Sequence, residues 1–213
     1  MKTSIFSFLF LITLSLSGLA QDYDADLQSL LPQIGTATKP AELSLLASQL
    51  SSLAKGEPNR WEASFWAAHC MVLQAFGEKD ADKVDPILDQ AEPVIEKLIK
   101  MKPTEPEFYV LRAMLNQARI AVNPMLRGMK YAGRANDNLD LAIELDANNP
   151  RAWHLKGANV FGTPSMFGGG KEKAKPLFQK ADSLFSTYTQ RSPYHPNWGK
   201  EQNDKMLKAC DQE

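Results

Sequence analysis

The stretches ANDNLDLA (residues 135–142) and AKPLFQKA (residues 174–181) decide the fold that this chain is expected to adopt. In each, an alanine is followed four positions later by a large apolar residue, Leu139 or Phe178, and three positions after that by another alanine. Positions three and four apart lie on one face of a helix. We therefore expect two helices whose alanines approach a neighbouring helix closely, while the large side chains fill the gaps between them.

A matching first helix precedes each stretch. Trp153 and Gly157 stand ahead of the second stretch, and Tyr109 and Ala113 stand at the corresponding positions ahead of the first. Together these positions resemble the tetratricopeptide repeat (TPR), a helix-turn-helix unit of about 34 residues with aromatic and small residues at fixed offsets. The resemblance covers residues 59–188. It implies an all-α fold in which tetratricopeptide-like helical hairpins stack as a short solenoid with capping helices; a bundle of unrelated helices is the alternative.

A third copy of the pattern is weaker. Trp66 and Cys70 take its first-helix positions, and its second-helix positions are taken by Val84, Leu88 and Ala91. The spacing between copies exceeds the usual period because of insertions at residues 122–130 and 162–170, between the two helices of a hairpin. Both insertions carry Pro, Met and Gly, and we predict loops there. These loops either build the wall of a pocket or only pack against the scaffold, with Met filling irregular gaps.

Breaks between the apolar stripes predict the remaining elements. No run alternates in the way that a half-buried strand requires, so no strand is expected. Gly77 ends one helix and Pro150 opens another. We expect helices over residues 22–31, 38–55, 60–76, 80–101, 105–121, 150–161, 171–189 and 199–210, and a long helix that begins at Met125 or Arg134 and ends at Asp146.

The first residues have the pattern of a secretory leader. Lys2 precedes an apolar run over residues 5–16, and Gly18-Leu19-Ala20 supplies small residues before a cut. The run is too short for a membrane-spanning helix, which needs about 20 residues. We expect a periplasmic or secreted protein with no membrane span after the leader is removed. Its expected parts are a signal peptide over residues 1–20, cut after Ala20, and a single helical domain over 21–213, with a repeat core at 59–188 and a C-terminal strap and cap at 189–213.

A second, looser resemblance concerns Asn149-Pro150-Arg151-Ala152 and the segment TPSMFGGG (residues 163–170). Some bacterial envelope proteins of the repeat type carry similar segments, and they include periplasmic proteins that accompany small-molecule transporters. This resemblance implies a place in the cell envelope.

Charge and motifs exclude several classes of function. The 24 Lys and Arg nearly balance the 25 Asp and Glu, and no basic stripe suits a phosphate backbone, so nucleic acid is not an expected partner. The sequence has no His-Glu-x-x-His, Gly-x-Ser-x-Gly or Gly-x-x-x-x-Gly-Lys-Ser/Thr motif. We therefore expect no enzyme: no catalytic residue, no metal site and no cofactor. The run Gly168-Gly169-Gly170-Lys171 either forms a tight turn or presents N–H groups to an anion.

The resemblance also implies a binding surface, because first helices mainly line the concave groove of tetratricopeptide arrays. By that register one unit would turn Arg151, His154, Ala158 and Phe161 inward, and another would turn Glu107, Val110, Met114 and Gln117 inward. An arginine can bind a carboxylate through two parallel bonds, although a charged helical residue is most often simply solvated. The candidate ligand- or partner-binding residues of the groove and loops are Arg112, Asn116, Met125, Arg127, Tyr131, Arg151, Trp153, His154, Phe161, Met166 and Phe167.

The C-terminal part leaves two questions open. The segment from Tyr194 to Trp198 holds three ring residues among prolines, and it is either a recognition surface or a strap that packs over the end of the stack. Cys70 and Cys210 are the only cysteines. They either form a disulfide, as an exported protein permits, or remain a buried thiol and a terminal one.

Three functions fit these observations to different degrees. The first is a scaffold protein of the envelope that holds a protein or peptide partner, possibly a transporter subunit, in its groove. The second is a periplasmic small-ligand-binding accessory of a transporter, which would need a closed pocket near Met125, Trp153, Met166 and Tyr194. An enzyme is least favoured, because it would need His69 or His154 beside several carboxylates in one cleft.

Overall fold

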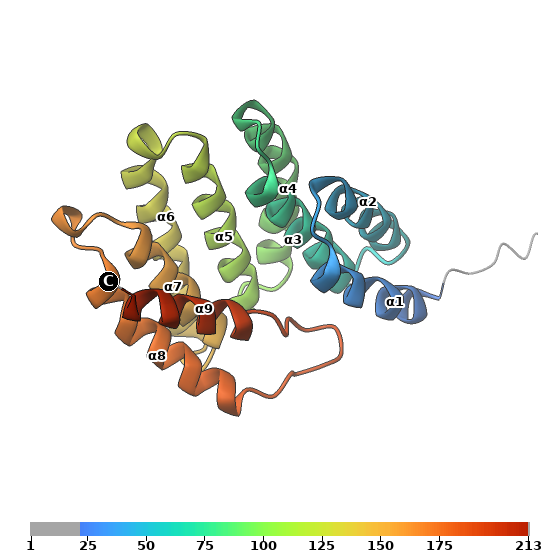
Figure 1. Ribbon diagram of the computed structural model, residues 1–213. Coiled ribbons are helices and arrows are strands. Elements are labelled where there is room, and N and C mark those ends of the chain that lie inside the picture. Colours follow the sequence, from blue (N-terminus) through green and yellow to red (C-terminus); the bar gives the residue numbers. More distant parts are fainter. Residues whose placement is uncertain (1–21, 213) are drawn as a thin grey trace, which may run out of the picture.

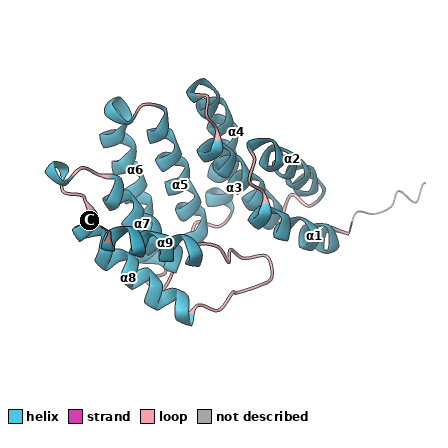
Figure 2. Ribbon diagram, in the orientation of Figure 1, coloured by secondary structure: helices cyan, strands magenta, loops and turns pink. Residues whose placement is uncertain are grey.

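A computed structural model describes residues 22–212, and this part of the chain is helical with no strand (Figure 2). The described residues form nine α-helices and one short 3-10 helix, η1. The expected all-α class is therefore confirmed. The bounds are α1 Tyr23–Thr36, α2 Pro40–Gly56, α3 Glu62–Gly77, α4 Ala81–Met101, α5 Pro106–Val122, α6 Pro124–Leu145, α7 Pro150–Gly162, η1 Ser165–Phe167, α8 Lys171–Thr187 and α9 Lys200–Asp211.

The helices pair as consecutive hairpins: α1 with α2, α3 with α4, α5 with α6, and α7 with α8. The helices α1, α3, α5 and α7 also contact one another in sequence, so they form an inner layer, and α9 folds back against α8. Figure 1 shows this curved stack from the blue α1 to the red α9. The solenoid of hairpins expected from the sequence is thus present, and the pair α1 and α2 adds a hairpin that the repeat pattern does not mark.

The small residues of the repeat pattern do lie between helices. Ala135, Ala142, Ala174 and Ala181 are all fully buried. Gly157 shows how close the contact is, because a Cβ built there would lie 2.7 Å from Cε1 of Phe178. The alanine spacing therefore predicts the packing of α6 and α8 correctly, and glycine is required where α7 meets Phe178.

An ion-pair network fixes the outer helices to α5. The guanidinium of Arg119, which is 7% exposed, contacts three carboxylates of α4, with N–O distances of 2.7 to 2.9 Å. Arg127 of α6 pairs with Asp85, one of the three, at 2.8 Å. A buried guanidinium is tolerated because carboxylates surround it. The carboxylates belong to Asp85, Asp89 and Glu92.

One predicted loop is wrong. Residues 124–130 form the first turns of α6 rather than a loop, because the side chain of Asn123 accepts a hydrogen bond from Leu126 N and Pro124 suits the first turn of a helix. The second insertion is a loop that contains η1, with Gly168 at φ 88° and Gly170 at φ 104°. Those left-handed conformations favour glycine, which supports the tight-turn interpretation of the glycine run.

Cys70 and Cys210 are free thiols rather than a disulfide. Cys70 is buried in α3, and burial raises the pKa of its thiol to about 12, whereas Cys210 lies near the end of α9. Over residues 22–212, no helix has the length and apolar character needed to span a bilayer. The expected signal peptide and the cut after Ala20 lie outside the described residues.

Candidate ligand-binding groove

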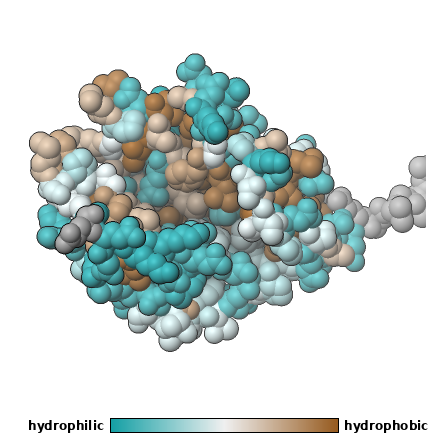
Figure 3. Space-filling view, in the orientation of Figure 1, coloured by the Kyte–Doolittle hydropathy of each residue, from teal (hydrophilic) through white to brown (hydrophobic). Residues whose placement is uncertain are grey.

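The concave side of the inner layer holds a cavity of about 840 Å³, called the groove below. Side chains of α1, α3, α5 and α7 form its floor and walls, and the segment that links α8 to α9, residues 188–199 (the strap), covers part of it. In Figure 3 hydrophobic side chains gather in the hollow at the centre of this face, next to the hydrophilic surface of α8 and α9. The lining residues are Gln28, Leu31, Pro32, Ile34, Gly35, Ala37, Trp66, His69, Leu73, Met114, His154, Leu155, Gln190, Pro193, His195, Asn197, Trp198 and Gln202.

The lining contains no lysine, arginine, aspartate or glutamate. Its walls are aliphatic and aromatic, and its polar groups are amides and imidazoles. Burying a charged group without a partner is costly. The groove therefore suits a ligand whose buried part is uncharged and apolar.

The strap crosses the inner layer. It does not cover the end of the stack, which was one of the two alternatives expected from the sequence. Trp66 Nε1 of α3 donates a hydrogen bond to the backbone oxygen of Tyr194 at 2.8 Å. The ring of His195 packs edge-on against Trp61 with centroids 5.0 Å apart. Pro193 and Pro196 keep the segment from forming a helix of its own, so it crosses the groove as an irregular segment with a turn at Pro193 and Tyr194.

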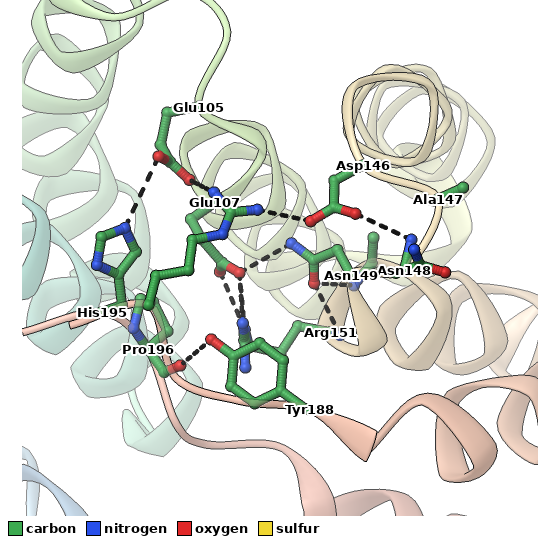
Figure 4. A network of polar contacts seen from close by, with 12 residues as sticks. Glu105, Glu107, Asp146, Ala147, Asn148, Asn149, Arg151, Tyr188, His195 and Pro196 are labelled. Atoms are coloured by element: carbon green, nitrogen blue, oxygen red, sulfur yellow. Dashed lines mark hydrogen bonds and ion pairs between the residues drawn. The ribbon is translucent and has the colours of Figure 1, made fainter. Parts of the chain in front are cut away.

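A polar network fastens the start of the strap (Figure 4). Arg191 contacts Asp146 at 2.6 Å and Glu105 at 3.4 Å. His195 Nε2 lies 3.9 Å from the same Glu105 carboxylate, whose side chain is only 2% exposed. Tyr188 OH donates to the backbone oxygen of Pro196 at 3.0 Å. The strap is thus held by α5 and by the turn that precedes α7.

Arg151 does not face the groove, contrary to its predicted role. Its guanidinium is buried between α7 and α5, where Nη2 lies 2.6 Å from Oε1 of Glu107. Asn149 donates to the same oxygen at 2.8 Å, and the Tyr188 ring lies 4.5 Å from the guanidinium carbon. The pair is internal because the turn before α7 brings the arginine directly over the first turn of α5, where the carboxylate accepts hydrogen bonds from its Nε and Nη2.

His69 lies deepest among the groove histidines. It stacks on Phe65 and contacts Trp66 and Trp198, with centroids 5.2 to 6.2 Å apart. Both ring nitrogens are buried without a hydrogen-bond partner in the part of the chain that the structure describes. Burial, together with the smaller effect of the nearby charge of Arg151, lowers the pKa of His69 to about 3. The imidazole is therefore neutral, and its nitrogens are buried.

Each of the other two groove histidines has its Nδ1 engaged in a hydrogen bond. His154 Nδ1 lies 3.2 Å from Oδ1 of Asn203, and burial lowers the pKa of this histidine. His195 Nδ1 lies 2.8 Å from the hydroxyl of Ser192, and burial lowers its pKa as well. Within residues 22–212 no three His, Cys, Asp or Glu side chains are arranged to hold a metal ion.

The predicted site residues fall into three separate places. Of these residues only His154 lines the groove, where it is joined by Met114, another residue of the predicted inward register. Met125, Met166 and Phe167 project into solvent at two hairpin tips. The others belong to packing or to internal polar contacts: Arg112, Asn116, Arg127, Tyr131, Arg151, Trp153 and Phe161.

The pocket proposed from the sequence is also misplaced, because none of Met125, Trp153, Met166 and Tyr194 lines the groove. The residues that the sequence missed come mainly from α1, α3 and the strap. Trp66, His69 and Leu73 are spaced by three and four positions on α3, which is a helical stripe of the kind that marked the other helices. That stripe indicated an apolar face on α3, but it did not show that the strap returns to cover this face.

No protein-family model and no curated protein matches the sequence. Among solved structures, the chain is similar to the HusA haemophore from Porphyromonas gingivalis. The two share 30% sequence identity and superpose with a TM-score of 0.82, over 91% of this chain and 94% of the HusA chain. The chain belongs to the HusA family.

HusA is a haemophore, which is a binding protein and not an enzyme. No enzyme family is indicated for this chain. The HusA chain shares the helical fold described here over nearly the whole of both chains.

Proposed function

We propose that this chain is a non-enzymatic, exported carrier that binds haem in the groove beneath the strap. The observation that carries the proposal is the uncharged, aromatic lining of the groove in a member of the HusA family. Haem is a broad flat ring that is apolar on both faces and carries two carboxylates on one edge. A groove of about 840 Å³ lies within the range of small-molecule sites, about 300 to 1,000 Å³.

The lining determines how the ring would lie. Leu31 and Ile34 of α1 and Leu155 of α7 offer aliphatic surface, and Trp66 and Trp198 offer aromatic surface. Because the lining has no basic side chain to pair with carboxylates, the carboxylate edge would point to solvent. The apolar faces would supply most of the affinity, since burial of such surface contributes about 25 cal/mol per Å².

Coordination of the iron is not part of this proposal. Both nitrogens of His69 are buried, and Nδ1 of His154 and of His195 each face a hydrogen-bond partner. Each of these nitrogens would have to leave its present surroundings to reach the iron. We propose that binding depends on the porphyrin ring, so that a metal-free porphyrin binds with similar affinity.

The wider role follows from this ligand. The leader over residues 1–20, cut after Ala20, would deliver a single tetratricopeptide-like domain to the periplasm or the exterior. The strap already crosses the concave face, which leaves less room there for a peptide than an open array would. We therefore propose that a protein partner, such as a transporter subunit, receives the haem and contacts the scaffold outside the groove.

Absorbance titration with haem and with metal-free protoporphyrin IX tests the proposal. We expect both to bind, and Trp198→Ala to weaken both by roughly tenfold or more, since it removes a large apolar contact. Trp153→Ala is the matched control, because Trp153 lies outside the groove and bonds only to the turn before α7. Binding of haem without protoporphyrin would assign the affinity to the iron, and failure of both to bind would overturn the proposal.

A further inference from the structure

Large apolar side chains project from two neighbouring hairpin tips. At the start of α6, Met125 is 94% exposed, Leu126 80% and Met129 81%. At η1, Met166 is 83% exposed and Phe167 62%. Both tips lie at the same side of the molecule, at the upper left of Figure 1, and Figure 3 shows apolar surface on both. These five residues are called the apolar tips below.

Packing does not explain the apolar tips. The buried apolar residues of α6 and α8 that hold the scaffold lie one or more turns away, so replacing the tip side chains by polar ones would remove no core contact. Exposed apolar groups of this size cost solubility, and clusters of them mark surfaces that meet a protein or a membrane.

Basic side chains flank the tips. The stretch from Pro124 to Asn136 carries Arg127, Lys130 and Arg134 and no acidic residue. Lys173 stands at the other tip, with its ammonium 3.9 Å from the Cβ position of Gly168. Arg127 is paired with Asp85.

Three cations therefore remain for a partner, since Lys130, Arg134 and Lys173 form no ion pair with the residues that the structure describes, 22–212. The aromatic ring of Tyr131 lies between Lys130 and Arg134, 5.3 and 5.5 Å from their charged groups. An apolar tip ringed by long basic side chains matches a membrane interface, where apolar groups enter the acyl region and Lys and Arg reach the phosphates.

We propose that the apolar tips dock this protein on a lipid bilayer that carries anionic headgroups. The separate, protruding side chains favour a fluid lipid surface over a folded partner, because a protein partner would need two matched pockets at a fixed distance. Docking is independent of haem binding, since none of the five residues lines the groove.

Flotation with phosphatidylcholine vesicles, with and without phosphatidylglycerol, tests the proposal on the mature chain. We expect binding to the anionic vesicles at low salt. The variant Met125→Ser/Met129→Ser/Phe167→Ser should lower the partition coefficient on both kinds of vesicle by roughly tenfold or more, because three large side chains no longer enter the acyl region. Lys130→Gln/Lys173→Gln should weaken binding to the anionic vesicles only.

Leu45→Ser/Phe76→Ser is the matched control, because these side chains are also exposed, 62% and 47%, but lie outside the tips. The control should bind vesicles as the unaltered chain does, and all variants should keep their circular dichroism and their haem titration. Absence of vesicle binding, equal loss in the control, or capture of an envelope protein by the tips without any vesicle binding would each overturn the lipid proposal. A haem titration that fails in the unaltered chain would overturn the proposed carrier function alone.

Discussion

Arg151 and Glu107 form a buried ion pair that joins α7 to α5. Nη2 of the arginine lies 2.6 Å from Oε1 of the glutamate, and Nε lies 2.9 Å from the same oxygen. Both side chains are almost fully buried, with 2% and 4% exposed. The Tyr188 ring covers the guanidinium at the start of the strap. One pair thus connects two inner helices and the segment that covers the groove.

Loss of the carboxylate should destabilise the fold strongly. We expect Glu107→Gln to lower the free energy of unfolding by about 3 to 5 kcal/mol, because it leaves the Arg151 charge buried without a counter-charge. Urea unfolding followed by circular dichroism measures the change. Glu144→Gln, on the exposed face of α6, is the control and should change stability by no more than about 0.5 kcal/mol. The interpretation fails if the two variants are equally stable.

The repeat pattern predicted the scaffold because the alanine contacts are local to each helix pair. The spacing of Ala135 and Ala142 indicates that α6 packs closely against its neighbours, and no distant part of the sequence is needed for this inference. The groove has no such local signal. Trp198 meets His69 only because the chain reverses after α8, and the distance between them in the sequence hides the contact. Arg151 was misassigned for the same reason: its partner, Glu107, comes from the preceding hairpin.

The contact between Gly157 and Phe178 gives a second prediction. Alanine at position 157 would place its Cβ 2.7 Å from Cε1 of Phe178 and 2.8 Å from Cδ1. Phe178 is fully buried and has little room to move, so Gly157→Ala should cost about 1 to 3 kcal/mol of stability. Thermal unfolding measures this cost, and Phe178→Leu in the same chain should reduce it.

Gly133→Ala is the matched control for this substitution. Gly133 also lies within a helix, α6, but a Cβ there meets no atom within 4 Å. Alanine should therefore stabilise the protein by about 0.5 to 1 kcal/mol, since glycine is the poorer residue in a helix interior. If both alanine variants changed the free energy of unfolding in the same direction, α7 and α8 would not be packed as closely as described.

His69 should make the protein sensitive to mild acid. Its pKa is about 3 in the fold and has an ordinary value of 6.5, so the unfolded chain binds the proton more readily. The contribution of His69 to the free energy of unfolding should be fully present above pH 6.5. It should be lost as the pH drops from 6.5 toward 3, with a slope of up to about 1.4 kcal/mol per pH unit for this group. His154 and His195, whose pKa values burial also lowers, act in the same direction.

Urea midpoints measured between neutral pH and about pH 5.5, a range that stays about one unit above the ordinary pKa of glutamate, about 4.3, test this prediction. The bond to Arg127 lowers the pKa of the Asp85 carboxyl below its ordinary value of 3.8, so this group contributes little to the pH dependence in this window. His69→Phe keeps a ring between Phe65 and Trp198 and removes the titrating group, so its midpoint should depend less steeply on pH. An unchanged slope in this variant would place the acid sensitivity elsewhere.

Trp66 should control how firmly the strap covers the groove. Its Nε1 donates to the Tyr194 oxygen at 2.8 Å, so Trp66→Phe removes this bond, worth about 1 kcal/mol, and keeps an aromatic side chain in α3. Hydrogen exchange should become faster in residues 189–199 and stay unchanged in α4 and α6. Trp153→Phe removes a bond of the same kind, to the Ala147 oxygen at 2.9 Å, but that bond does not reach the strap. Faster exchange of the strap in both variants, or in neither, would mean that the Trp66 bond is not what holds it.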